Sequence, residues 1–389
     1  MNASVTDLLR EHPVIDGHND LLWALRHRHN YDFDAVDIGE RQDGLVHTDL
    51  PRLREGGVGA QFWSVYVPST MGAEAVGATL EQVDAAYRMI ERYADRMALA
   101  TTADEVEAAW AVGRVASLLG AEGGHQIDGS LAVLRMYHRL GVRYLTLTHN
   151  DNVAWADSAT DDRVLGGLND VGRGVVAEMN RLGMMVDLSH VSAETMRDAL
   201  DVSTAPVIFS HSSAYALVDH PRNVPDDVLA QLPDNGGLCM VTFVPAFVSP
   251  AVRARQLSIE ADARAGGIDV RDLDAMAEFA RSRLADKPTA TLADVVAHCQ
   301  HVREVAGIDH IGLGGDYDGV DELPEGLTDV AGYPRLLDAL AQEGWSDDDL
   351  AKLGWRNITR VLGEAEIVAA ELRGSCGPSL ATIDELDGH

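Results

Sequence analysis

The sequence predicts an α/β fold, a (β/α)8 TIM barrel formed as one domain by residues 1–389. Short apolar runs rich in β-branched residues alternate along the chain with stretches whose apolar residues recur every three or four positions. This is the pattern of strands that alternate with helices. Eight such runs are found, and eight parallel strands close a barrel. No linker rich in Pro, Ser or Gly divides the chain, and a barrel with long loops reaches this length as one domain.

Most of the predicted strands end in Gly, Ser, His, Asn or Asp, residues that favour loops and turns. The strands are predicted at 13–20, 59–68, 115–124, 142–150, 183–190, 206–213, 236–243 and 310–319. Helices are predicted between them, for example over 80–100 and 171–183. The interval 244–309 contains a charged helix at 270–285 and is interpreted as a long insertion after the seventh strand. A doubly wound open sheet shows the same alternation and is the alternative fold.

Composition excludes several classes of protein. A formal net charge of −31 without a cluster of Lys and Arg indicates no nucleic acid partner. Cys239, Cys299 and Cys376 are widely spaced and form no CxxC pair, so neither a disulfide framework nor a thiolate zinc site is indicated. No secretory signal, membrane span or lipid-anchor pattern is found. We therefore expect a soluble, cytoplasmic protein with no membrane partner, and the sequence leaves homo-oligomer formation open.

The main functional signal is a set of metal-binding residue types at predicted strand ends, where a barrel places its active site. The first strand ends in HND, and the two-residue period of a strand puts His18 and Asp20 on one face. Glu122 ends the third strand, His190 the fifth and His211 the sixth. A lone strand-end histidine is more often a hydrogen-bonded loop residue, but a barrel brings all five together. Such ligands suit catalytic zinc with open coordination positions, so we expect two Zn²⁺ per chain, bridged by Glu122.

Two carboxylates compete for the role of general acid and base. The last strand ends in GGDYDG, which places Asp316 at its end and Asp318 on the same face. A carboxylate that faces a metal-held hydroxide can accept its proton and return it to a leaving amine. We assign this role to Asp316, with Asp318 as the alternative.

Two further residues are candidates for binding substrate. His149 ends the fourth strand and is assigned to the substrate carbonyl or its oxyanion, with capping of a helix or loop as the alternative. Arg222 lies in the loop HPRNVP, which two prolines stiffen. Its guanidinium can bind a substrate carboxylate in a bidentate pair, and an ordinary surface arginine is the alternative. His27 and His29 lie beyond the first strand in a charged segment and are not expected to bind metal.

The blocks that contain these residues resemble the renal or membrane dipeptidases, peptidase family M19 of the amidohydrolase superfamily. The blocks run in order over nearly the whole chain and read DGHND, AEGGHQI, LTHNDNVAWADS, VDLSHVS, FSHSSAYALVDHPRNVPDD, IGLGGDYDG and GWRNITRVL. The resemblance implies a (β/α)8 barrel with two zinc ions. It implies that one ion is held by the equivalents of His18 and Asp20. The other would be held by those of His190 and His211, and Glu122 would bridge the two.

The resemblance also implies roles for the three remaining residues. In similar enzymes the position of Asp316 serves as general base and acid, that of His149 contacts the scissile carbonyl, and that of Arg222 binds the terminal carboxylate. The family includes enzymes that accept a D-residue at the carboxyl end, and some animal members open β-lactams. Animal members carry a secretion signal, disulfides and a lipid anchor, which this sequence lacks, so it looks like a soluble bacterial-type relative.

Together these features predict a metal-dependent dipeptidase, a metallopeptidase in which a hydroxide that bridges two zinc ions attacks the peptide bond. The expected small-molecule substrate is a dipeptide with a free carboxyl end, and L-Xaa-D-Xaa dipeptides are candidates. The alternative enzyme is another amidohydrolase that acts on a cyclic amide, lactone or phosphoester. A non-catalytic metal-binding barrel is the alternative from another class of protein.

Overall fold

The computed structural model describes residues 3–270, 273–281 and 287–381. Within these residues the strands form one sheet in the order β2-β1-β9-β8-β7-β6-β5-β4-β3, and every pair is parallel. A further pairing of β2 with β4 closes the ring and leaves β3 outside it. The barrel strands are β1 (Val14–Asn19), β2 (Val58–Ser64), β4 (Val115–Glu122), β5 (Val142–Thr146), β6 (Met185–Asp187), β7 (Ile208–Ser212), β8 (Leu238–Val241) and β9 (Ile311–Leu313). Each predicted strand overlaps one of them, so the barrel is confirmed and the open sheet is not.

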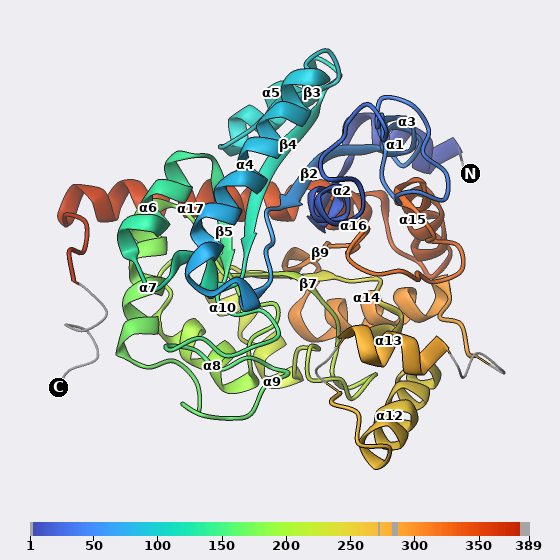
Figure 1. Ribbon diagram of the computed structural model, residues 1–389. Helices are drawn as coiled ribbons and strands as arrows, with labels where there is room; N and C mark the ends of the chain where they lie inside the picture. The colour runs from blue at the N-terminus through green and yellow to red at the C-terminus, as the bar shows by residue number, and fades with distance from the viewer. Residues whose placement is uncertain (1–2, 271–272, 282–286, 382–389) are drawn as a thin grey trace.

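Helices surround the strands (Figure 1). The α-helices are α1 (Ala3–Glu11), α2 (Leu21–His29), α3 (Leu50–Glu55), α4 (Ala75–Arg92), α5 (Ala103–Ala111), α6 (Leu131–Arg139), α7 (Asp170–Leu182), α8 (Ala193–Val202), α9 (Asp226–Leu229), α10 (Leu232–Asn235), α11 (Pro245–Val248), α12 (Pro250–Ala265), α13 (Leu273–Arg281), α14 (Leu292–Ala306), α15 (Tyr333–Gln342), α16 (Asp347–Ala351) and α17 (Asn357–Ser375). Short 3₁₀ helices are η1 (Ser69–Glu74), η2 (Gly124–Ile127), η3 (Ile308–His310) and η4 (Val330–Gly332), and η5 (Lys352–Arg356) is a π-helical turn. In the described part of the chain, none of the helices is both long and apolar enough to cross a bilayer.

Capping residues fix where the helices after β5 and β6 begin. The side chain of Asn169 accepts a hydrogen bond from the third amide of α7, and that of Ser192 does the same for α8. α7 ends at Leu182 and is capped by Gly183, whose φ of 82° is a left-handed conformation that glycine adopts without strain. Ser192, the cap residue of α8, lies two residues after His190, one of the predicted metal ligands, and fixes the backbone there.

The helix predicted over 80–100 is wrong at its C-terminal end. α4 ends at Arg92, and Met97–Leu99 form β3, which pairs with the outer edge of β4. A short apolar run fits either a helix or a strand by pattern alone. Here the run forms a strand because it hydrogen-bonds to the edge of β4. The helix predicted over 171–183 is confirmed as α7.

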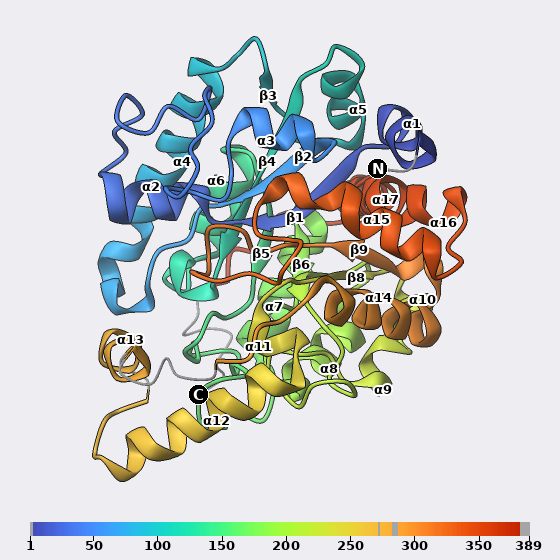
Figure 2. The same ribbon diagram turned by 90° about the vertical axis from the view of Figure 1, so that its right-hand side faces the viewer.

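The predicted insertion after the seventh barrel strand, β8, carries the helices α11 to α14. α14 packs against β8 and β9 as a barrel helix, whereas α12 and α13 extend from the barrel at the edge of the molecule (Figure 2). The charged helix predicted over 270–285 appears as α13 over 273–281. Residues 271–272 and 282–285 of that prediction lie outside the described residues.

Two apolar clusters hold the barrel together. One joins residues from successive strands, among them Ile15, Phe62, Leu118 and Met240, and fills the barrel interior. The other packs the outer faces of the strands against the helices. The interior is therefore a packed core and not a pore. This core lies directly beneath the polar residues at the strand ends and supports them.

Candidate metal centre

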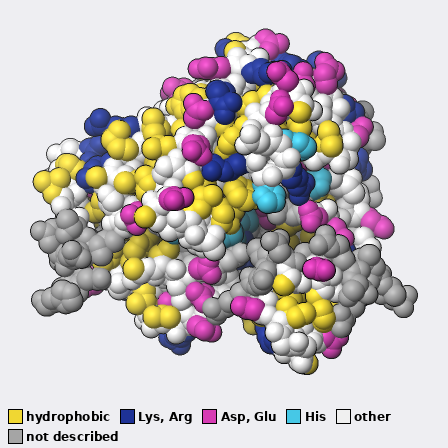
Figure 3. All heavy atoms as spheres, in the orientation of Figure 1, with side chains coloured by type: hydrophobic (Ala, Val, Ile, Leu, Met, Phe, Trp, Pro, Cys, Tyr) yellow, Lys and Arg dark blue, Asp and Glu magenta, His cyan; other side chains and the backbone are white. Residues whose placement is uncertain are grey.

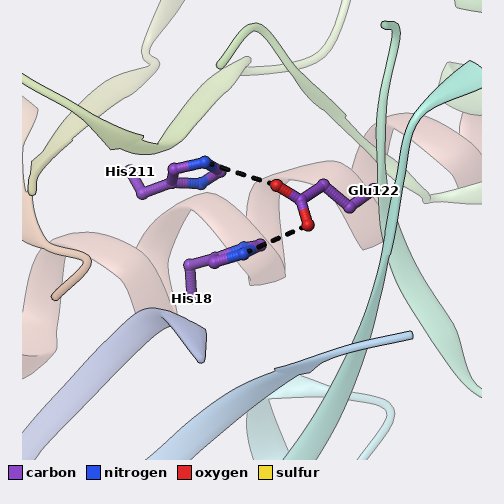
Figure 4. A group of neighbouring side chains, drawn as sticks. All are labelled: His18, Glu122 and His211. Atoms are coloured by element: carbon purple, nitrogen blue, oxygen red, sulfur yellow. Dashed lines mark ion pairs between the residues drawn. The ribbon is translucent and has the colours of Figure 1, made fainter. Parts of the chain in front are cut away.

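The five predicted ligand residues meet at the carboxyl ends of four barrel strands. His18 lies in β1, Asp20 follows it directly, Glu122 is the last residue of β4, His190 follows β6 and His211 lies in β7. All five side chains are buried. Figure 3 shows histidine side chains gathered near the centre of one face of the molecule, and Figure 4 shows His18 and His211 pointing toward the carboxylate of Glu122.

The Glu122 carboxylate lies between two groups of nitrogen ligands. Its Oε2 is 3.4 Å from His18 Nε2, and its Oε1 is 3.1 Å from His190 Nε2 and 3.5 Å from His211 Nε2. The hydroxyl of Ser64, at the end of β2, donates a hydrogen bond of 3.1 Å to Oε2. Each carboxylate oxygen thus faces a different set of imidazoles, which is the arrangement that a bridging ligand requires.

His190 and His211 face each other through their Nε2 atoms, which are 3.0 Å apart. Burial lowers the pKa of both imidazoles well below the ordinary value, and the positive charge of Arg222 lowers both further. Both rings are therefore neutral at neutral pH. Neutral imidazoles that converge in this way offer lone pairs to a common cation.

The charges around His18 favour a cation at the same place. Burial lowers the pKa of His18, but Tyr144, Glu122 and Asp20 raise it well above the ordinary value. Burial raises the pKa of Glu122, but His18 and His190 lower it well below its usual range. Asp20 Oδ1 is buried and has no hydrogen-bond partner among the described residues. A divalent cation would supply the missing partner, so the donor set fits a metal.

Metal-competent side chains form three overlapping groups within the described residues. In each group the ligand atoms lie within 4.8 Å of one another: His18, Glu122 and His211; Glu122, His149 and His190; and His18, Asp20 and Asp316. Glu122 and His18 each belong to two groups. The overlap indicates that more than one cation position can be built from these residues.

His149 lies beside the centre and not away from it. Its Nε2 is 3.7 Å from Glu122 Oε1, and its ring centroid is 4.3 Å from that of His190 and 4.6 Å from that of Tyr66. Burial lowers the pKa of His149 to about 4. The ring is therefore neutral at neutral pH, and it retains one N–H that can donate to a ligand in the centre.

The structure separates the two carboxylates that follow β9. Asp316 Oδ1 lies 4.0 Å from His18 Nε2, and burial together with the charges of Asp20 and Glu122 raises the pKa of Asp316 well above its usual range. Asp318 instead binds the backbone of His47: its Oδ1 accepts a hydrogen bond of 2.7 Å from the His47 amide. Only Asp316 faces the centre, so the geometry favours Asp316 over Asp318 for proton transfer.

Backbone strain gathers at these strand ends. His190, Asp316 and Asp318 have φ values of 69°, 60° and 67°, in the left-handed region that non-glycine residues seldom occupy. Strained residues of this kind cluster at functional sites, where the surrounding structure fixes them. The strain aims the His190 and Asp316 side chains into the centre.

Arg222 is buried near the centre and not on the surface. Its guanidinium carbon lies 5.2 Å from the ring centroid of Phe247, and burial lowers its pKa to about 10 although Asp316 and Glu122 raise it. Within the described residues its buried Nη1 has no hydrogen-bond partner. A buried cation with a free donor is poised to bind an anionic group.

Some residues at the centre carry no metal-ligand signal and were not predicted. Ser64 lies inside the predicted second strand, 59–68, and becomes a strand end only because the observed β2 stops there. No strand-end pattern in the sequence therefore indicated it. Tyr66 packs against His149, and its ring centroid is 5.2 Å from that of Trp23. No sequence pattern indicates these aromatic contacts. His27 lies on α2 stacked on Trp23, and neither His27 nor His29 belongs to the metal-competent groups of the described chain.

Comparison with known proteins identifies the family. The model of the membrane dipeptidases, peptidase family M19, matches residues 2–375. The chain belongs to this family. It is 43% identical over 380 residues to dipeptidase tcpJ of Claviceps purpurea (strain 20.1), which covers 95% of this chain and 80% of that protein. The resemblance seen in the sequence blocks is confirmed, and this member of the M19 family is a metal-dependent hydrolase of the dipeptidase type.

Solved structures show the same architecture. The probable dipeptidase PvdM from Pseudomonas aeruginosa superposes with a TM-score of 0.81 at 22% identity, over 94% of this chain and 98% of that one. A metallopeptidase from Rhodobacter sphaeroides, liganded with a phosphinate mimic of the dipeptide L-Ala-D-Ala, has a TM-score of 0.75 at 27% identity. That comparison covers 91% of this chain and 99% of the other.

Proposed function

We propose that this M19 family member is a binuclear zinc dipeptidase that cleaves dipeptides with a free carboxyl end. The position of the Glu122 carboxylate carries the proposal, since Oε2 faces His18 and Oε1 faces His190 and His211. One cation would be held by His18 and Asp20 and the other by His190 and His211, with Glu122 between them. Nitrogen and carboxylate ligands without thiolate suit zinc. Bound there, the two cations would activate a water and polarise the peptide carbonyl.

Arg222 and His149 would position the substrate. The guanidinium of buried Arg222, whose Nη1 has no partner among the described residues, would bind the terminal carboxylate in a bidentate pair. The charges of Asp316 and Glu122 raise the pKa of Arg222, so the guanidinium lies within their electrostatic reach. A substrate carboxylate held by Arg222 would place the adjacent peptide bond near the centre. Neutral His149 would donate a hydrogen bond to the carbonyl oxygen as negative charge develops on it.

Asp316 would move the proton. Burial and the charges of Asp20 and Glu122 raise its pKa well above the usual value, so this carboxyl group binds a proton more tightly than an ordinary aspartate does. As a carboxylate it accepts a proton from the attacking water, and as an acid it returns that proton to the departing amine nitrogen. A raised carboxyl pKa is typical of a general acid and base, and this supports the assignment of proton transfer to Asp316.

The stereochemical preference is the finer part of the proposal. The Rhodobacter sphaeroides metallopeptidase is liganded with a mimic of L-Ala-D-Ala, and the two chains align over most of their length. We therefore propose that L-Xaa-D-Xaa dipeptides are among the substrates of this chain. The buried Arg222 disfavours the alternative of a neutral cyclic amide or lactone, because such substrates offer no anionic group to its guanidinium.

A substrate panel tests this function. The purified protein, with its zinc content measured on the same sample, is assayed with L,L and L,D dipeptides, with their C-terminal amides and with lactones. We expect hydrolysis of the free-acid dipeptides, loss of activity on chelation and recovery on addition of zinc, with the amides at least about 100-fold slower. Preferential turnover of amides or lactones would contradict the proposal. Activity on L,L dipeptides alone would overturn its stereochemical part.

A further inference from the structure

His18 is held from behind by a tyrosine hydroxyl. Its Nδ1 lies 2.8 Å from the hydroxyl of Tyr144, and this hydroxyl donates a hydrogen bond of 3.3 Å to the carbonyl of Gly17. A hydroxyl that donates to a carbonyl has lone pairs left to accept the Nδ1–H of the imidazole. The proton then sits on Nδ1, and the lone pair of Nε2 points at the centre.

The barrel is built to admit this tyrosine. Tyr144 lies on β5, is fully buried and reaches across the interior to β1. Gly120 on β4 leaves the space for its ring, because a Cβ atom at that position would overlap the ring carbons. The hydroxyl of Tyr144 therefore reaches His18 only because β4 carries glycine there.

His211 is held by a different pair of residues. Its Nδ1 lies 2.8 Å from the hydroxyl of Ser210, which donates a hydrogen bond of 2.6 Å to Asp187 Oδ2. The same carboxylate oxygen accepts 2.6 Å from the hydroxyl of Thr146, and Oδ1 accepts 2.8 Å from the Ser210 amide. Because Ser210 gives its hydroxyl proton to Asp187, it must accept the proton of His211 Nδ1.

His190 has no such support. Its Nδ1 is buried and has no hydrogen-bond partner within the described residues. Of the two imidazoles at the cation position between His190 and His211, only that of His211 is oriented by a hydrogen bond to its Nδ1. This orientation depends on the Asp187–Ser210 pair. The position between His18 and Asp20 depends in the same way on Tyr144.

We propose that Tyr144 and the Asp187–Ser210 pair are two independent sets of positioning residues, each of which sets the affinity of one cation position. Tyr144 serves the His18 and Asp20 position, and Ser210 with Asp187 serves the His190 and His211 position. The proposal rests on the binuclear centre proposed above. Partners that orient a metal-bound histidine contribute about 10–100-fold to metal affinity, so each loss is expected to weaken one position by about that factor.

Metal titration of the full chain tests the proposal. Metal-free protein is titrated with Zn²⁺ against a competing chelator, and Co²⁺ absorption gives a second readout that does not depend on activity. We expect two binding steps in the parent protein. Tyr144→Phe and Ser210→Ala should each weaken one step by about 10–100-fold and leave the other unchanged. Asp187→Asn is a second variant of the Asp187–Ser210 pair and should weaken the same step as Ser210→Ala.

Two further variants, each lacking one ligand, show which metal-binding step belongs to which cation position. With His190→Asn, the remaining step belongs to His18 and Asp20 and should weaken with Tyr144→Phe but not with Ser210→Ala. With His18→Asn, the pattern should reverse. Tyr137→Phe and Ser117→Ala are the matched controls, because Tyr137 is a buried tyrosine that donates to the carbonyl of Gln126. Ser117 is a buried serine whose hydroxyl has no partner among the described residues.

The outcomes separate this inference from the proposed function. Fewer than two cations on the parent protein would remove the binuclear centre itself. Two cations with unchanged affinities in Tyr144→Phe and Ser210→Ala would overturn the inference and leave the binuclear centre standing. Equal weakening of both steps by either variant, or by a control, would also overturn it, since it would indicate a general loss of structure. Thermal unfolding of each variant confirms that the protein compared is folded.

Discussion

Replacing Asp316 by asparagine is expected to lower kcat by about 10²–10⁴-fold, the usual contribution of a general acid or base. Asparagine keeps the size of the side chain but can neither accept a proton from water nor return one to the leaving amine. Asp316 lies 4.0 Å from His18 Nε2 through Oδ1, and its position at the edge of the ligand set should leave both metals bound. The measurement is steady-state kinetics on a dipeptide with zinc content determined on the same sample.

Asp318→Asn is the matched control. This carboxylate also follows β9 and is also buried, but its Oδ1 accepts the amide hydrogen of His47. We expect it to affect stability more than kcat. A near-native rate in Asp316→Asn with full metal content would remove Asp316 from proton transfer, and a large loss of kcat in Asp318→Asn alone would transfer the role to Asp318.

Replacing Arg222 by alanine is expected to lower kcat/KM by about 10²–10³-fold, mainly through KM. A buried, hydrogen-bonded charge pair that loses one partner costs about 2–5 kcal/mol, and each 1.4 kcal/mol is a factor of ten. The buried Nη1 of Arg222 has no partner in the described chain, so its expected partner is the substrate carboxylate. The measurement compares kcat and KM for one dipeptide in the parent and the variant.

A matched substrate isolates this interaction. The C-terminal amide of the same dipeptide lacks the negative charge, so the parent protein should discriminate strongly against it and Arg222→Ala should not. Arg163→Ala replaces an exposed arginine outside the centre and should behave like the parent. Equal activity of Arg222→Ala on the free acid would favour an amidohydrolase that acts on neutral substrates.

The sequence predicted the barrel and its rim because both depend on local patterns. Strand periodicity puts His18 and Asp20 on one face, and a parallel barrel brings all strand ends to one rim. These two facts bring Glu122, His190 and His211 within reach of His18 without knowledge of side-chain geometry. The structure agrees with this convergence, with nitrogen-to-oxygen distances of 3.1–3.5 Å around Glu122.

Other features depend on contacts that no local pattern encodes. β3 is a strand only because it meets the free edge of β4. The choice of Asp316 over Asp318 follows from the hydrogen bond between Asp318 and His47, which lie 271 residues apart. Tyr144 reaches His18 across 126 residues of chain, and its space depends on Gly120 of a third strand. Tyr144 and Gly120 carry no metal-ligand pattern in the sequence, and only the folded structure reveals their role.

We propose that two cations share the Glu122 carboxylate at the mouth of the barrel. Anomalous X-ray scattering from crystals of the zinc-loaded protein, measured on both sides of the zinc absorption edge, tests this claim most directly. We expect two zinc peaks on opposite sides of Glu122, one beside His18 and Asp20 and the other beside His190 and His211. A single peak, or peaks away from Glu122, would contradict it.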